Sequence, residues 1–170
     1  MQVALTSETQ FPIAHHYDVM AQLDRDVHDD HELSTAEVET TLRLLGDVPK
    51  RVFLPCFGTG RHITPLLAAG VQRIVGVDLS PQCVVKARRS HSNDPRVELN
   101  VGDLTTWATR EPFDAAILLG NSFGDLIAPT MLLKVTRGMV GPLSPNGKLV
   151  MDYIGEGYLD RCREGTPVRW

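Results

Sequence analysis

The spacing of apolar residues along the chain changes near residue 50. Before that point, Val38, Leu42 and Leu45 follow one another at i, i+4 and i+7, so they would share one face of a helix. The spacing predicts a helix over 35–45. Weaker helical signals predict one or two short helices within 11–32.

Polar residues at both ends support the helix over 35–45. Ser34 and Glu37 have the spacing of a capping box, in which each side chain satisfies a backbone N–H at the start of a helix. Gly46 offers a C-terminal cap. Residues 1–10 show no periodicity, and we expect them to be mobile.

From residue 51 onward, short apolar runs of strand length alternate with helical patterns. The predicted strands are 51–55, 73–78, 96–101, 113–120 and 147–154, and the predicted helices are 62–69, 81–90 and 130–140. Ser80 and Pro81 give the middle helix an N-cap and a first-turn proline. Repeated strand–helix units form right-handed crossovers, so we expect a single α/β domain over 1–170, with a parallel sheet covered on both faces.

Composition excludes several other classes of protein. Hydrophobic residues make up 42% of the 170 residues and charged residues 22%, as in soluble globular proteins. No apolar run approaches the roughly 20 residues of a membrane-spanning helix, and the first residues lack the pattern of a secretory signal. The three cysteines form no disulfide framework and no zinc-binding pair, which favours a reducing, cytoplasmic location.

Charge is divided unevenly along the chain. Residues 1–50 carry ten acidic side chains against three Lys and Arg, whereas residues 51–170 carry eleven against fourteen. The net charge of −4 gives no general reason to bind nucleic acid. The acidic stretch 24–32 also holds His28 and His31, but no partner cluster with ligand spacing occurs elsewhere. We therefore expect a solvated surface there and no metal site.

A glycine turn joins the first predicted strand to its helix. Gly58 and Gly60 permit a tight turn and let a ligand approach the backbone. Asp78 follows Gly60 by eighteen residues and ends the second strand, where a carboxylate can accept hydrogen bonds from both hydroxyls of a ribose. The alternative role of Asp78 is to cap the turn at Ser80. The two features together favour a nucleoside ligand.

Two absent motifs narrow the kind of nucleoside. A dinucleotide fingerprint beginning at Gly58 would need a third glycine at the position of Ile63. A phosphate loop needs Gly-Lys-Ser/Thr where this chain has Gly60, Arg61 and His62. A nucleoside without phosphates fits better, and a nucleotide-dependent oxidoreductase is disfavoured.

Five segments resemble, in order and spacing, the successive motifs of class I S-adenosylmethionine-dependent methyltransferases. They are LPCFGTGRH, IVGVDLSP, VGDLTTW, FDAAILLGNSFGDL and LSPNGKLVMDY. The closest resemblance, over about residues 17–160, is to small-molecule N-methyltransferases of the glycine/sarcosine and sugar-amine type. It implies a Rossmann-like sheet of order 3-2-1-4-5, S-adenosyl-L-methionine as cofactor, and methyl transfer to a small molecule, an amine above all.

The resemblance also implies roles for residues around the cofactor. Those that would line its methionine portion are Cys56, Phe57, Gly58, Thr59 and Gly60. Asp78 would hold the ribose, and Leu79 would pack on the adenine. Tyr17, in a Tyr-Asp-x-Met segment, resembles an N-terminal tyrosine that closes over the cofactor.

Two further segments would complete the site. Gly102, Asp103 and Leu104 would form the adenine rim, with Asp103 accepting a hydrogen bond from the exocyclic amine. The floor beneath the transferable methyl group would be formed by Leu119, Gly120, Asn121, Ser122 and Phe123. Methyl transfer from a sulfonium needs alignment more than activation, so Asn121 and Tyr17 are the catalytic candidates. A modest base suffices for an amine acceptor, and the sequence singles out no residue for it, although His15 and His16 beside Tyr17 are conceivable.

The chain departs from the family pattern at two places. Leu54 stands where family members usually carry an acid that helps to fix the cofactor's amino group, and Cys56 replaces the first motif glycine. Only about 16 residues follow the fifth predicted strand, so we expect the C-terminal antiparallel hairpin of the family to be absent. The chain would then be part of a longer protein or self-associate through that exposed strand. The alternative function is a domain that binds S-adenosylmethionine without catalysis, or a non-catalytic subunit.

Overall fold

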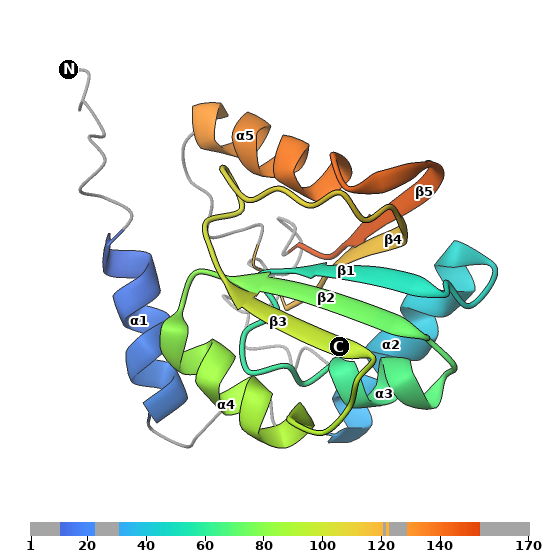
Figure 1. Ribbon diagram of the computed structural model, residues 1–170, viewed down its shortest axis with the longest axis horizontal. Coiled ribbons are helices and arrows are strands. Elements are labelled where there is room, and N and C mark those ends of the chain that lie inside the picture. The colour runs from blue at the N-terminus through green and yellow to red at the C-terminus, as the bar shows by residue number, and fades with distance from the viewer. Residues whose placement is uncertain (1–10, 23–30, 121, 123–128, 154–170) are drawn as a thin grey trace, which may run out of the picture.

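The protein is described by a computed structural model that covers residues 11–22, 31–120, 122 and 129–153 (Figure 1). Its parallel sheet has the order β3-β2-β1-β4-β5. The strands are β1 (Arg51–Pro55), β2 (Arg73–Asp78), β3 (Val97–Val101), β4 (Phe113–Leu118) and β5 (Leu143–Met151). The predicted α/β class and strand order are confirmed.

Helices cover both faces of this sheet, as the strand–helix alternation predicts. The described helices are α1 (Phe11–Gln22), α2 (His31–Leu45), α3 (Ile63–Ala68), α4 (Pro81–His91) and α5 (Pro129–Val140). In Figure 1, α5 lies on one side of the sheet, and α2, α3 and α4 lie on the other. The predicted mobile segment 1–10 lies outside the described residues.

The pleat of the central strand β1 divides the core between the two faces. Val52 and Leu54 point into the apolar cluster under α2, α3 and α4, whereas Phe53 points into the cluster under α5. Alternate residues of a strand face opposite sides of a sheet, so a β1 that is buried on both sides must be apolar throughout. This rigid central strand carries the glycine turn at its carboxyl end.

The beginning of α2 differs from the capping-box prediction. The helix begins at His31, so Ser34 and Glu37 lie within it and cannot cap its start. Ser34 is buried, and its Oγ accepts a hydrogen bond from Arg61 Nη1 at 3.1 Å. The prediction was wrong because both polar side chains are engaged by the segment after β1 and not by the backbone of their own helix.

The beginning of α4 agrees with the sequence. Ser80 is its N-cap, and its Oγ accepts a hydrogen bond from the Cys83 N–H at 3.1 Å. Asp18 of α1 joins the same helix start, because its Oδ1 accepts hydrogen bonds from Ser80 Oγ at 2.5 Å and from the Gln82 N–H at 3.2 Å. These contacts attach α1 to α4, beside the carboxyl end of β2.

Strand β5 begins earlier than the predicted strand 147–154. Its pairing with β4 is irregular, since Phe113 pairs with Leu143 but Ala115 pairs with Lys148. Gly147 fits this irregularity because a Cβ there would lie 2.9 Å from Leu143 Cβ. In the described sheet, β5 pairs only with β4 and forms an edge.

Candidate active site

Apart from Tyr17 on α1, the predicted cofactor residues that the structure describes lie at the carboxyl ends of the parallel strands. Between β1 and β4 the chain changes direction across the sheet, and ligands of open α/β sheets bind at such switch points. The glycine turn follows β1, Asp78 ends β2, and Leu119 and Gly120 follow β4. Asn121 and Phe123 lie outside the described residues.

The glycine turn adopts left-handed backbone angles that explain its sequence. The φ angles of Cys56, Gly58 and Gly60 are 50°, 58° and 86°. A Cβ on Gly58 would meet no described atom within 4 Å, so that side of the turn is open to a ligand. A Cβ on Gly60 would instead lie 2.9 Å from Ile63 Cδ1 and 3.1 Å from Ala87 Cβ. Gly60 therefore permits close packing of the turn on the core, and the open approach is at Gly58.

Phe57 lies beneath the turn. Its ring is buried, and it covers Gly76 of β2 so closely that a Cβ there would be 2.6 Å from Phe57 Cδ1. Cys56 ties the turn to the same strand, because its N–H donates to the Val77 carbonyl at 2.7 Å. These contacts hold the turn in a fixed position over β2.

The Asp78 carboxylate accepts hydrogen bonds from two turns: the turn at Ser80, which it was proposed to cap, and the glycine turn. Its Oδ1 accepts a hydrogen bond from the Ser80 N–H at 2.9 Å, and its Oδ2 accepts one from the Gly58 N–H at 2.7 Å. Burial raises the pKa of this carboxyl, although the backbone hydrogen bonds oppose that effect. The carboxyl is thus held between β2 and the open face at Gly58, where ribose binding remains a prediction.

The loop after β3 lies next to Asp78. The Gly102 N–H donates to the Asp78 carbonyl at 2.9 Å. Asp103 Oδ1 accepts hydrogen bonds from the N–H and the hydroxyl of Thr105, at 2.8 and 2.7 Å. Leu104 is buried, whereas Leu79 is 37% exposed. The predicted adenine residues are thus adjacent to the predicted ribose residue, with one exposed apolar side chain among them.

Tyr17 lies on α1, which α4 holds at this end of the sheet. Its carbonyl accepts a long hydrogen bond from Cys83 Sγ at 3.8 Å, and its half-buried ring meets the ring of His16 edge-on at 5.5 Å between centroids. The structure thus places Tyr17 near the start of α4. A contact between its ring and the cofactor remains a prediction.

A charged cluster beside the turn was missed at the sequence level. Glu37 of α2 accepts hydrogen bonds from both terminal nitrogens of Arg61 and pairs with His62 Nε2 at 2.8 Å. Burial opposes ionisation of Glu37, but the hydrogen bonds from His62 and Arg61 outweigh it and lower the pKa of the carboxyl to about 2. The only signal was the presence of Arg61 and His62 directly after the glycine turn.

The segments after β4 and β5 approach the same cluster. Gly120 N–H donates to Asp152 Oδ2 at 2.9 Å, and Asp152 N–H donates to the Leu118 carbonyl at 3.1 Å. A Cβ on Gly120 would lie 3.5 Å from Arg61 Nη2. The carboxyl ends of β1, β4 and β5 therefore share a polar border formed by Arg61 and Asp152.

Two negative findings apply to the described ranges. They hold no group of three or more His, Cys, Asp or Glu side chains arranged to bind a metal ion. Nor do they include a helix with the length and apolar character needed to cross a membrane.

Comparison with known proteins decides between the classes compatible with this geometry. A family model described as a methyltransferase domain matches residues 55–147, from the end of β1 into β5. The chain belongs to this methyltransferase domain family. The matched segment contains the glycine turn, Asp78 and the loop after β3.

Individual relatives agree with this family. The glycine/sarcosine N-methyltransferase of Aphanothece halophytica is 32% identical over 126 residues, which are 72% of this chain and 47% of that protein. The crystal structure of a Pyrococcus horikoshii OT3 protein is similar with a TM-score of 0.68 and 26% identity, over 82% of this chain and 66% of that chain.

A third relative shares the fold. The structure of CalS10 with S-adenosylmethionine bound, an amino pentose methyltransferase from Micromonospora echinaspora, has a TM-score of 0.62 and 21% identity, over 91% of this chain and 59% of that chain. The chain spans about half the length of the curated relative that it matches. Membership of a methyltransferase family is confirmed, as the sequence motifs indicated.

Proposed function

We propose that this chain binds S-adenosyl-L-methionine and transfers its methyl group to a small molecule, an amine in particular. The observation that carries the proposal is the junction of Asp78 with Gly58, where a held carboxyl borders an open glycine turn within the family's matched segment. The names of the relatives support the same chemistry, since two are N-methyltransferases or amino-sugar methyltransferases.

The residues present fit the cofactor. Gly58 leaves open space above the turn, and Asp78 retains carboxylate lone pairs that can accept from ribose hydroxyls. Leu79 offers an exposed apolar surface for the adenine, and Asp103 offers a carboxylate at its edge. Together these residues would recognise a nucleoside without phosphates.

When bound, the cofactor supplies a methyl group on a sulfonium, which is already an activated leaving group. The chain's own contribution is alignment, since an in-line displacement depends on the approach of the acceptor. Leu119 and Gly120 follow β4 at the carboxyl edge of the sheet, and Asn121 comes next in the sequence. We propose that Asn121 positions the acceptor and that Tyr17 of α1 covers the cofactor. An amine acceptor must be neutral to attack, and a weak base suffices for that.

We further propose that the protein works in the cytoplasm on a small-molecule substrate, without nucleic acid or membrane partners. The odd, sparse set of three cysteines and the net charge of −4 support this. We also propose self-association through β5, because an edge strand presents N–H and C=O groups that another chain can pair with.

The test is transfer of a labelled methyl group from S-adenosylmethionine to a panel of amines, including glycine, sarcosine and an amino sugar. We expect one amine class to be methylated and S-adenosylhomocysteine to inhibit. Tight binding of S-adenosylhomocysteine without transfer to any acceptor would instead identify a binding domain. Failure to bind would contradict the proposal.

A further inference from the structure

A small hollow lies between the glycine turn and the carboxyl end of β4. Its described lining consists of Leu54, Pro55, Cys56, Phe57, Gly60, His62, Ile63, Ile117 and Leu119. Among these residues, His62 is the one whose side chain carries a nitrogen or oxygen atom. The side chains around the hollow are therefore apolar apart from one thiol and a single imidazole, and backbone atoms add to its polar lining.

Glu37 fixes which nitrogen of His62 is available. The Glu37 carboxylate is an acceptor, so Nε2 of a neutral ring must carry the proton that it donates across 2.8 Å. Nδ1 then carries the lone pair. His62 stands at the N-cap of α3 but makes no capping hydrogen bond with its side chain, and Nδ1 has no hydrogen-bond partner among the described residues. The fully enclosed side-chain nitrogen and oxygen atoms that lack a partner in the described chain do not include Nδ1. Nδ1 is therefore accessible to a ligand.

Burial keeps the His62 ring neutral near neutral pH. Three charged groups face it: Glu37 from α2, Arg61 from the turn and Asp152 from the segment after β5. Burial and Arg61 lower the pKa of His62, whereas Glu37 and Asp152 raise it, and burial is the largest effect. Arg61 already balances the negative charge of Glu37, so the His62 ring is left as an uncharged acceptor.

We propose that Nδ1 of His62 accepts a hydrogen bond from the α-ammonium group of the cofactor's methionine portion, with Glu37 as the positioning residue for the ring. A charged ammonium that leaves water needs hydrogen-bond acceptors, and the free lone pair of this imidazole supplies one beside the polar backbone of the turn. The hollow borders the turn to which the methionine portion is assigned, and Leu54, which replaces the expected acid, lies in its wall. The inference rests on the proposed function, because it concerns the same cofactor.

The experiment compares two ligands by calorimetric titration. One is S-adenosylhomocysteine, and the other is the same molecule with hydrogen in place of its α-amino group, 5′-S-(3-carboxypropyl)-5′-thioadenosine. We expect the wild-type chain to bind the first about tenfold more tightly or better, because an unpaired buried acceptor and a lost charged hydrogen bond both oppose binding of the second.

Variants locate that preference at His62. His62→Leu removes the acceptor, so the preference for the amino compound should fall to about twofold or less. His62→Asn restores an acceptor, since its Oδ1 can occupy the position of Nδ1, and part of the preference should return. The matched control is His91→Leu: His91 is bonded to the Thr64 hydroxyl and the Ala87 carbonyl, away from the hollow, so the full preference should remain.

Glu37→Gln tests the positioning role. The amide can still pair with the ring but no longer demands a proton from Nε2, so the tautomer is released. The preference should shrink to an intermediate value, while binding of the deaminated ligand changes little. An equal loss for both ligands would mean that Glu37 serves only the structure.

The pH dependence of the wild-type chain keeps the inference testable if a variant does not fold. An imidazolium at His62 would repel the ligand's ammonium, so the preference should be full near pH 8 and decline only below pH 6.5, the ordinary value from which the pKa of His62 is lowered. A preference that already declines between about pH 8 and 7, or that persists in a folded His62→Leu variant, would overturn the inference.

The outcomes separate this inference from the proposed function. Binding of S-adenosylhomocysteine with no role for its amino group would refute the inference and leave the methyltransferase proposal standing. If His62→Leu raised only KM for the acceptor amine, the ring would serve the acceptor, and the inference would again be wrong. No binding of either ligand would contradict both.

Discussion

Glu37 shows how one side chain can be placed by packing and not by its own helix. It lies in the middle of α2, yet its carboxylate meets Arg61 and His62 from the segment after β1. The Glu37 side chain is 20% exposed and that of Arg61 10%. Removing one partner of an ion pair that is shielded to this degree destabilises more than in an exposed pair, because the other charge is left shielded and uncompensated, although the solvent still screens part of it.

The pH dependence of stability should reflect this pair. The pKa of Glu37 is lowered to about 2 from an ordinary value of 4.5. Its contribution is therefore fully present above pH 4.5 and is lost as the pH falls through the folded value near 2. After allowance for screening by solvent, Glu37→Gln should destabilise the protein by about 1–2 kcal/mol at pH 7 and by little near pH 2.

Urea denaturation of both proteins at several pH values measures this difference. Glu39→Gln is the matched control, because Glu39 is exposed on the same helix. Its effect on stability should be small at every pH. A Glu37→Gln difference that did not shrink in acid would contradict the assigned ionisation.

Asp78 is the residue on which the proposed cofactor recognition most depends. Asp78→Ala should weaken binding of S-adenosylhomocysteine by about 1–3 kcal/mol, the effect of losing hydrogen bonds to a charged group. The melting temperature should also fall, because Gly58 and Ser80 lose their acceptor. Calorimetry measures the affinity, and Asp47→Ala in an exposed loop serves as control. Unchanged affinity in a folded Asp78→Ala variant would disprove the ribose assignment.

Some residues of the candidate site could be predicted from the sequence, and others could not. Asp78 was found because the end of a parallel strand has a fixed place at the edge of a sheet. The partnership of Glu37 with Arg61 and His62 could not be found, since it depends on how α2 packs against the segment after β1. The sequence assigned Glu37 to a capping box with Ser34, and that assignment was wrong.

At the scale of elements, the two glycines of the glycine turn lack a side chain for different reasons. Gly60→Ala places a Cβ against Ile63 and Ala87 at a φ of 86°, so it should destabilise the fold by about 1–3 kcal/mol. Gly58→Ala places a Cβ into open space at a φ of 58°, so it should destabilise by only about 1 kcal/mol.

Binding should show a different order from stability. Gly58→Ala should reduce the affinity for S-adenosylhomocysteine strongly, because its Cβ enters the space above the turn. Urea denaturation and calorimetry on the two variants measure both quantities. If Gly58→Ala bound as wild type, the open side of the turn would not be the ligand's side.

Element boundaries were predictable where local chemistry decides them. Ser80 and Pro81 marked the start of α4 because capping and a fixed proline φ act within a few residues. The start of β5 was missed because its first residue pairs with Phe113 across an irregular register. The neighbouring strand β4 decides this pairing, so the sequence of β5 alone shows no pattern that marks its start.

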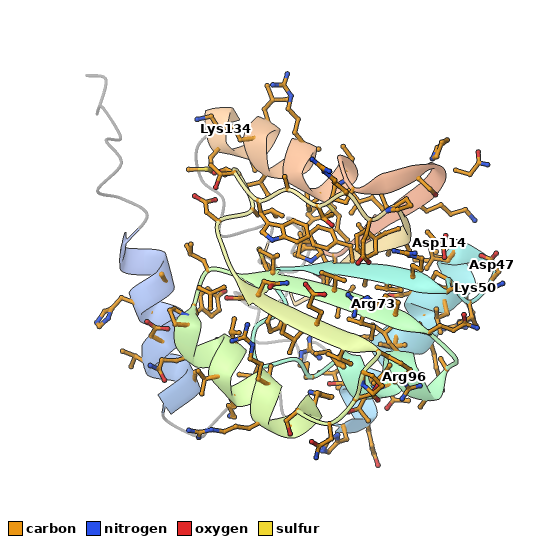
Figure 2. The ribbon with its side chains drawn as sticks, viewed as in Figure 1. Asp47, Lys50, Arg73, Arg96, Asp114 and Lys134 are labelled. Atoms are coloured by element: carbon orange, nitrogen blue, oxygen red, sulfur yellow. The ribbon has the colours of Figure 1, made fainter. Side chains whose placement is uncertain are left out.

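At the scale of the whole molecule, the two ends of the sheet have different chemistry. Charged pairs gather at the amino ends of the strands, where Arg73 contacts Glu98 and Glu111, and Asp114 accepts from the Lys50 N–H. Figure 2 shows Lys50 and Asp114 close together at this end. The carboxyl ends carry the open glycine turn and the shielded pair of Arg61 with Glu37, so the proposed ligand site and the more exposed ion pairs lie at opposite ends of the strands.

Ligand binding should stabilise the whole domain. At about 100 times its Kd, a ligand that binds only the folded state stabilises it by about 2.7 kcal/mol, which raises Tm by roughly 5–10 °C for a chain of this size. A thermal-shift assay should show this for S-adenosylhomocysteine and not for NAD. A rise in Tm with NAD alone would instead favour a nucleotide-dependent oxidoreductase, the function that the sequence disfavours.

The edge at β5 gives a prediction about assembly. We expect sedimentation to show self-association of the 170-residue chain that weakens in Met151→Lys, because a charged side chain on an edge strand discourages pairing with another chain. Leu133→Lys, at an exposed position of α5, is the control and should leave association unchanged. A chain that remains monomeric at high concentration would contradict this use of the edge.

The stacked rings of Phe53 and Trp107 have an optical consequence. Their centroids are 5.0 Å apart and their planes differ by 5°, while the Trp107 N–H of the backbone donates to the Asp103 carbonyl at 2.8 Å. One face of the indole is therefore held by the core, and its loop is the predicted adenine rim. An adenine that settles there would alter the surroundings of a fixed fluorophore, so the intrinsic emission of the protein should report occupancy of the site without any label.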